Sequence, residues 1–120
     1  MYKDWQAMAA DLTGDIRTLR AGVPEVMKGF SALAQAALKA DALDTKTKEL
    51  IALAIAVATR CDGCIAFHAE AAMKQGATRA EVLETMGMAV YMGAGPSVMY
   101  AAQALEAFDQ FSAKQGSRAA

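Results

Sequence analysis

The stretch that decides the fold covers residues 49–68 and reads ELIALAIAVATRCDGCIAFH. It holds both cysteines of the chain, Cys61 and Cys64, and its single histidine, His68. Residues 50–58 carry no polar side chain, and a helix that is apolar on every side is buried on every side. In a chain of 120 residues, such a helix lies either at the centre of the domain or in a contact between subunits.

The composition around this stretch indicates helices throughout. Hydrophobic residues make up 55% of the chain and charged residues 21%, so the chain folds rather than staying disordered. Much of the apolar content is alanine, the strongest helix former, and no segment alternates as a strand does. We therefore predict an all-α protein of about six helices. A core of small side chains in so short a chain leaves surplus apolar surface, so we also expect a homo-oligomer.

Apolar periodicity and helix punctuation locate the expected elements. Pro24 and Pro96 suit the first turn of a helix, Gly22 and Gly76 suit its end, and the glycines of residues 93–95 predict a break. No linker or internal repeat divides the chain, so we expect a single domain over residues 1–120. The predicted helices cover residues 5–21, 24–40, 45–59, 64–75, 78–92 and 96–113.

Charge and hydropathy narrow the class of protein. The formal net charge is −1, and the chain shows neither a basic stripe nor a basic amphipathic helix, so we expect no nucleic-acid or membrane partner. The N-terminal octet MYKDWQAM lacks the apolar core of a signal peptide, and the apolar run of residues 50–58 is too short to cross a bilayer. We therefore expect a cytoplasmic protein, in which a C-x-x-C motif favours catalysis or metal binding over a permanent disulfide.

The cysteine motif can carry redox chemistry without a metal or an organic cofactor. If Cys64 opens a helix, the unpaired N–H groups and the positive end of the helix dipole favour its thiolate, with a pKa below the free value of about 8.5. His68, one turn further on, can share or accept the proton. Cys61 can then trap an oxidised Cys64 as a disulfide.

Glu49 is the fourth candidate residue, placed on the helix before the motif. If the two helices fold back on each other, its carboxylate approaches His68 and Cys64 and can pass protons. Glu49 can equally be an ordinary first-turn acid favoured by the helix dipole. The thiols also leave two alternatives open, which are zinc ligation with His68 and Glu49, and an inert buried pair.

At this point the residues resemble a known family. Glu49, eleven residues, Cys61-Asp62-Gly63-Cys64, three residues and His68 form a pattern similar to the alkyl hydroperoxidase D-like branch of the carboxymuconolactone decarboxylase family. The segments GATRAEV and MGAGP strengthen the resemblance, which covers about residues 20–112.

The resemblance implies an all-helical fold that assembles as trimers or hexamers and reduces hydroperoxides with thiols. Cys64 would be the peroxidatic nucleophile, and Cys61 the resolving thiol that exchanges with an external thiol or dithiol reductant. His68 and Glu49 would form the proton relay.

Two other activities remain open. The family's best-known peroxidase has a second histidine where this chain has Gly63, so the pair could instead serve redox sensing without turnover. A decarboxylase-like reaction on a cyclic acid would need an anion-binding group, and Arg60 is the basic residue near the motif.

Overall fold

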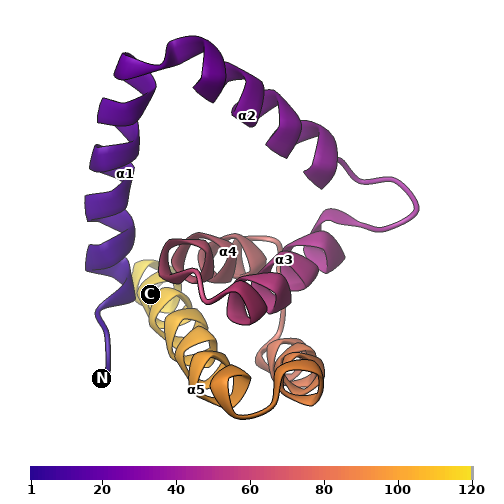
Figure 1. Ribbon diagram of the computed structural model, residues 1–120. Helices are drawn as coiled ribbons and strands as arrows, with labels where there is room; N and C mark the ends of the chain where they lie inside the picture. Colours follow the sequence, from indigo (N-terminus) through magenta and orange to yellow (C-terminus); the bar gives the residue numbers. More distant parts are fainter. Residues whose placement is uncertain (120) are drawn as a thin grey trace.

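The computed structural model describes residues 1–119, which form five helices and no strand (Figure 1). The all-α prediction is therefore confirmed. The helices are α1 (Trp5–Gly22), α2 (Pro24–Leu38), α3 (Thr45–Thr59), α4 (Asp62–Lys74) and α5 (Arg79–Ala119).

The core lies where α3, α4 and α5 pack against one another (Figure 1). Small alanine side chains let the helix backbones approach closely, and a few larger side chains fill the space between them. Leu53 and Val57 of α3, Ile65 of α4 and Val82 of α5 are fully buried members of this core, and Met86, Phe108 and Phe111 of α5 are buried beside them. The alanines buried with them include Ala56, Ala66, Ala69, Ala72, Ala104 and Ala107.

The N-terminal end of α1 packs against this core through a buried tryptophan. Asp4 caps the helix by accepting a hydrogen bond from the N–H of Ala7. The next residue, Trp5, is fully buried, and its indole N–H donates to Glu106 of α5 at 2.8 Å. Because the indole finds an acceptor, the large apolar ring can be buried without leaving a polar atom unpaired.

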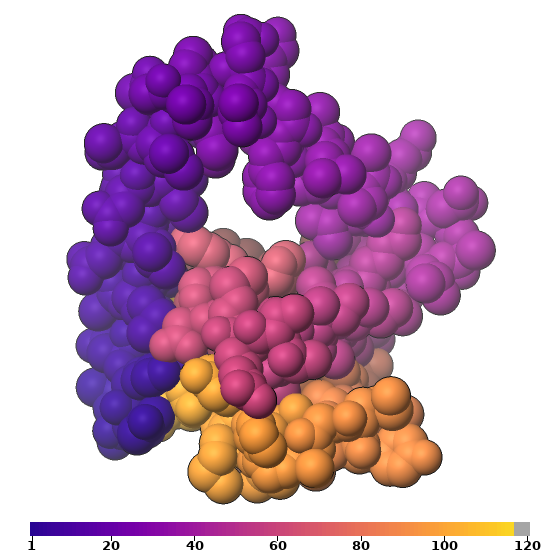
Figure 2. Space-filling view, in the orientation of Figure 1, coloured from indigo at the N-terminus to yellow at the C-terminus, as the bar shows by residue number. Residues whose placement is uncertain are grey.

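The far end of α1 and the whole of α2 stand away from the core as an arch (Figure 1). The space-filling view shows the opening between this arch and the body formed by the later helices (Figure 2). The predicted apolar side of α2 is present, but no residue of α2 is buried. Val26, Phe30 and Leu33 are 68%, 61% and 64% exposed. This side of α2 is therefore largely uncovered within the described chain.

The all-apolar helix α3 is buried on one side only. Leu53, Ala56 and Val57 face the core, whereas Ile51 and Ile55 lie exposed on the opposite side. Of the two explanations for this stretch, the domain centre accounts for one face of the helix. Burial in the domain centre does not account for the two exposed isoleucines, which lie on the side expected to be covered if this helix contacts another subunit.

The break predicted at residues 93–95 is present as a kink at which two helical segments of α5 meet. Helix α5 continues through Pro96, but Ala94 has φ 54° and ψ −140°, outside the helical region. A Cβ on Gly93 would collide with the side chain of Ser97, so glycine is needed at this close approach. The expected fifth and sixth helices are thus the two halves of α5.

Candidate active site

The connection from α3 to α4 brings the two cysteines to a helix start. Arg60 ends α3 in the left-handed conformation, with φ 56° and ψ 47°, and Cys61 then caps α4 in an extended conformation. Cys61 Sγ accepts a hydrogen bond from the N–H of Cys64 at 3.2 Å. Helix α4 begins at Asp62, slightly before the predicted start, and Cys64 lies in its first turn.

Cys61 and Cys64 are joined by a disulfide, with their Cα atoms 5.2 Å apart. This separation is typical of disulfides in proteins. Both residues are half-buried, so the pair lies at the surface of the helix bundle rather than inside the core. The two sulfur atoms therefore face each other, as a thiol pair that opens and closes requires.

The second part of the site is a contact between α3 and α4. His68 Nδ1 lies 3.3 Å from Glu49 Oε2. Glu49 is only 2% exposed, whereas the His68 side chain is 33% exposed. The other carboxylate oxygen, Oε1, is buried without a hydrogen-bond partner in the described part of the chain. Glu49 is thus a buried group directed at the histidine of the motif, and not a solvated first-turn acid.

The N-terminal segment covers both residues between the cysteines. Lys3 Nζ donates to Asp62 Oδ2 at 2.7 Å, and Leu12 of α1 packs over Gly63. A Cβ at position 63 would lie 2.9 Å from Leu12 Cδ1, so a side chain there would have to displace Leu12. Local sequence reasoning did not find Lys3, because no short-range spacing links it to a residue that lies 59 positions further on.

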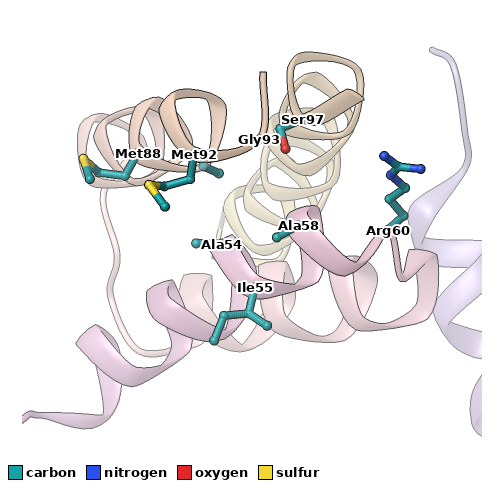
Figure 3. Close-up of a pocket in the computed structure, with 9 residues that line it drawn as sticks. Ala54, Ile55, Ala58, Arg60, Met88, Met92, Gly93 and Ser97 are labelled. Atoms are coloured by element: carbon teal, nitrogen blue, oxygen red, sulfur yellow. The ribbon is translucent and has the colours of Figure 1, made fainter. Parts of the chain in front are cut away.

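A separate cavity of about 420 Å³ lies between α3 and the two halves of α5 (Figure 3). Ala54 and Ala58 line it from α3, on the side of that helix away from Glu49, because residues five and nine positions apart point in roughly opposite directions. The Arg60 side chain rises at one end of the cavity, and Met88 and Met92 lie at the other. The basic residue near the motif thus lines an apolar cavity on the far side of α3 from the Glu49–His68 contact.

The described residues also show whether the chain groups metal ligands and whether a helix could cross a membrane. Within residues 1–119, no three His, Cys, Asp or Glu side chains are grouped so as to hold a metal ion. The two thiols that zinc would need are engaged in the disulfide. Over the same described residues, every helix is too short or too polar to cross a membrane.

Comparison with known proteins finds similarity to one protein family. Residues 24–107 match the carboxymuconolactone decarboxylase family. A crystal structure of a carboxymuconolactone decarboxylase family protein from Legionella pneumophila, in its apo form, is 59% identical with a TM-score of 0.88, over 90% of this chain and 96% of that one.

Three relatives are described only as uncharacterized proteins. One from Cupriavidus necator is 34% identical and covers 94% of this chain and 100% of its own length. One from Haemophilus influenzae is 41% identical over 90% of this chain and 96% of its own. One encoded in the cox locus of Paracoccus denitrificans is 38% identical over 78% of this chain and 83% of its own.

Proposed function

This chain belongs to the carboxymuconolactone decarboxylase family, and we propose that it is a thiol-dependent peroxidase of the alkyl hydroperoxidase D-like branch. It reduces organic hydroperoxides to alcohols and is restored by an external thiol or dithiol. The observation that supports this most is the Cys61–Cys64 disulfide at the start of α4, one helical turn from the Glu49–His68 contact. A dithiol, a base and a buried acid are then held by two packed helices.

The first step is attack by Cys64. Its position in the first turn of α4 favours the thiolate, which is the nucleophilic form, and His68 accepts the thiol proton. The sulfur attacks the terminal oxygen of the hydroperoxide, so an S–O bond forms as the O–O bond breaks. The departing alkoxide takes the proton back from His68 and leaves as an alcohol, and Cys64 is left as a sulfenic acid.

Cys61 completes the cycle. Its thiol attacks the sulfenic sulfur of Cys64, the S–S bond forms, and the sulfenic oxygen leaves as water with the Cys61 proton. The disulfide is then opened by thiol–disulfide exchange with the external reductant, which is itself oxidised. Two electrons have passed from that reductant to the hydroperoxide, with no metal and no organic cofactor.

Glu49 serves this cycle by holding His68. A carboxylate oxygen on Nδ1 selects the tautomer and orientation of the imidazole, so that Nε2 is left for the reacting groups. The burial of Glu49 removes competing water from this contact. The pair therefore acts as a proton relay in which His68 exchanges protons with the sulfur and Glu49 stabilises the charged imidazole.

We also propose that the protein works as a homo-oligomer, a trimer or hexamer, in the cytoplasm. The chain exposes 7383 Å², whereas a compact monomer of this mass exposes about 6200 Å². The excess resembles the area that one partner contributes to a stable interface, about 800 Å² or more. The exposed apolar side chains of α2 and α3 supply a surface of suitable chemistry.

Trapping the sulfenic acid tests the assignment of the two cysteines. Cys61→Ser, once reduced, should react with cumene hydroperoxide and accumulate a sulfenic acid at Cys64 that dimedone labels. Cys64→Ser should neither consume the hydroperoxide nor become labelled. Equal labelling of the two variants, or unchanged consumption in Cys64→Ser, would remove the proposed roles.

A further inference from the structure

The ion pair between Lys3 and Asp62 places a lysine beside the redox motif. Asp62 directly follows Cys61 and precedes Cys64 by two residues, so it lies in the same turn of the chain as both cysteines. Lys3 Nζ donates to this carboxylate at 2.7 Å, and to Gln103 Oε1 of α5 at 2.7 Å. The contact is held from two sides and is only partly exposed to solvent.

The backbone around Lys3 is fixed independently of its side chain. The N–H of Lys3 donates to Glu106 Oε1 at 2.9 Å, and the carbonyl of Lys3 accepts from Gln110 Nε2 at 2.7 Å. Trp5 is buried two residues later. The position of the lysine is therefore built into the fold, and changing its side chain leaves these attachments in place.

An aspartate inside the motif works against the proposed chemistry. A negative charge near a cysteine disfavours the thiolate, whereas the positive end of the helix dipole favours it. An unpaired Asp62 would therefore oppose the effect of the helix start on Cys61 and Cys64. The hydrogen bond to Asp62 also raises the pKa of Lys3 above its ordinary value, so Lys3 stays charged while the thiols titrate.

We propose that Lys3 is a positioning residue for the dithiol, which neutralises Asp62 and so keeps both thiols easy to ionise. Lys3 has this role only if the disulfide opens to a dithiol, as the proposed function requires. Removing the Lys3 charge should make the thiolates less stable, and the disulfide correspondingly harder to reduce. Removing the Asp62 charge should do the opposite.

The other ionisable groups around this turn are the same in every variant considered below, so their influence cancels in the comparison. They are Tyr2 beside Lys3, Arg60 at the end of α3, Glu49 and His68 of the relay, and Tyr100 and Glu106 of α5.

Opposite shifts in two single variants distinguish this charge effect from a structural one. The reduced proteins are titrated by the ultraviolet absorbance of the thiolate. In Lys3→Gln the midpoint should rise by about 0.5 pH unit, and in Asp62→Asn it should fall by a similar amount. Lys3→Gln/Asp62→Asn should return close to the original protein, and Lys3→Arg should not shift.

The matched control is Lys74→Gln, which removes a lysine paired with Glu70 at the other end of α4. Its midpoint should not move. If Lys3 only fastens the N-terminal segment, both single variants lose the same contact and shift in the same direction, which would overturn the proposal. The proposal is also overturned if neither single variant shifts.

This experiment separates the Lys3 proposal from the proposed function. An original protein whose thiols titrate like free cysteine, near pH 8.5, would contradict the proposed peroxidase. Opposite shifts around that higher midpoint would still support the role of Lys3. A low midpoint with shifts in the same direction would support the proposed peroxidase and overturn the role of Lys3.

Discussion

His68 Nδ1 lies 3.3 Å from Glu49 Oε2, and this contact joins the second turn of α3 to the helix that carries the cysteines. It holds the single histidine of the chain one helical turn beyond Cys64. Glu49 is buried at the cost of leaving its Oε1 without a hydrogen-bond partner in the described structure. A buried carboxylate that is only half satisfied costs stability, which is consistent with a residue kept for function.

Replacing Glu49 tests the relay. Glu49→Gln keeps the shape of the side chain but removes the charge that stabilises the protonated imidazole. We expect oxidation of the reduced protein by cumene hydroperoxide to slow about 10- to 100-fold, less than the about 100- to 10,000-fold of general acid–base catalysis itself, because His68 is still present. Stopped-flow tryptophan fluorescence can follow the reaction, and circular dichroism can verify the fold.

The matched control for this change is Glu70→Gln, which alters a glutamate on α4 that pairs with Lys74 at 3.8 Å. Its rate should stay within twofold of the original protein. The relay is refuted if Glu49→Gln is folded and reacts as fast as Glu70→Gln.

The exposed side of α2 should be the assembly surface. Phe30→Asp places a charge among Val26 and Leu33, where burial against another subunit would be costly. We expect a smaller oligomer by size-exclusion chromatography with light scattering. Gln35→Asp changes a residue on the opposite side of α2 and should leave the mass unchanged. An unchanged mass in Phe30→Asp would show that subunits meet elsewhere or not at all.

The kink in α5 should be strained at Ala94. Its φ of 54° and ψ of −140° suit glycine and cost other residues about 1–3 kcal/mol. Ala94→Gly should therefore raise the free energy of unfolding in urea by about 1 kcal/mol, after the entropic cost of glycine is subtracted. Ala102→Gly, in a regular part of α5, should lower it by about 1 kcal/mol. If both variants are destabilised alike, Ala94 is not strained.

Acid should loosen the N-terminal segment through Glu106. Burial alone would raise the pKa of this carboxyl, but hydrogen bonds from Tyr2, Lys3 and Trp5 outweigh burial and hold it below its usual value. A lowered carboxyl pKa gives stability that is complete above the unfolded value, about 4.5, and is lost as the pH falls through the folded value.

We therefore expect Glu106→Gln to be less stable than the original protein at pH 7, by about 1–3 kcal/mol for the loss of hydrogen bonds to a charged acceptor. Its stability should also fall less as the pH drops below about 4.5. Urea unfolding at several pH values measures both. Glu84→Gln, at an exposed position of α5, should follow the original protein, and a parallel fall in Glu106→Gln would contradict the account.

Local patterns predicted the elements well, because helix ends depend on short-range chemistry. Gly76 has φ 86° and follows α4, as expected of a glycine at a helix end, and Pro24 opens α2. The exposure of Phe30 was not predictable in the same way. Periodicity shows that a helix has an apolar side, but it does not show which chain covers that side.

In the candidate site, too, local spacing predicted some of the groupings and not others. Cys61 and Cys64 lie at the start of α4 and His68 follows one turn later on the same helix, so their grouping followed from spacing alone. The approach of Glu49 depended on α3 and α4 folding back on each other, a condition that the structure meets. The Lys3–Asp62 pair spans 59 positions, and nothing in the local pattern of either residue indicated it.

The most direct test of the central claim is a single-turnover reaction of the reduced protein with cumene hydroperoxide, followed by mass spectrometry. The account predicts that each chain consumes one hydroperoxide, releases one alcohol and ends with Cys61 and Cys64 joined. Hydroperoxide consumed by Cys64→Ser at the same rate, or no disulfide formed in the original protein, would contradict it.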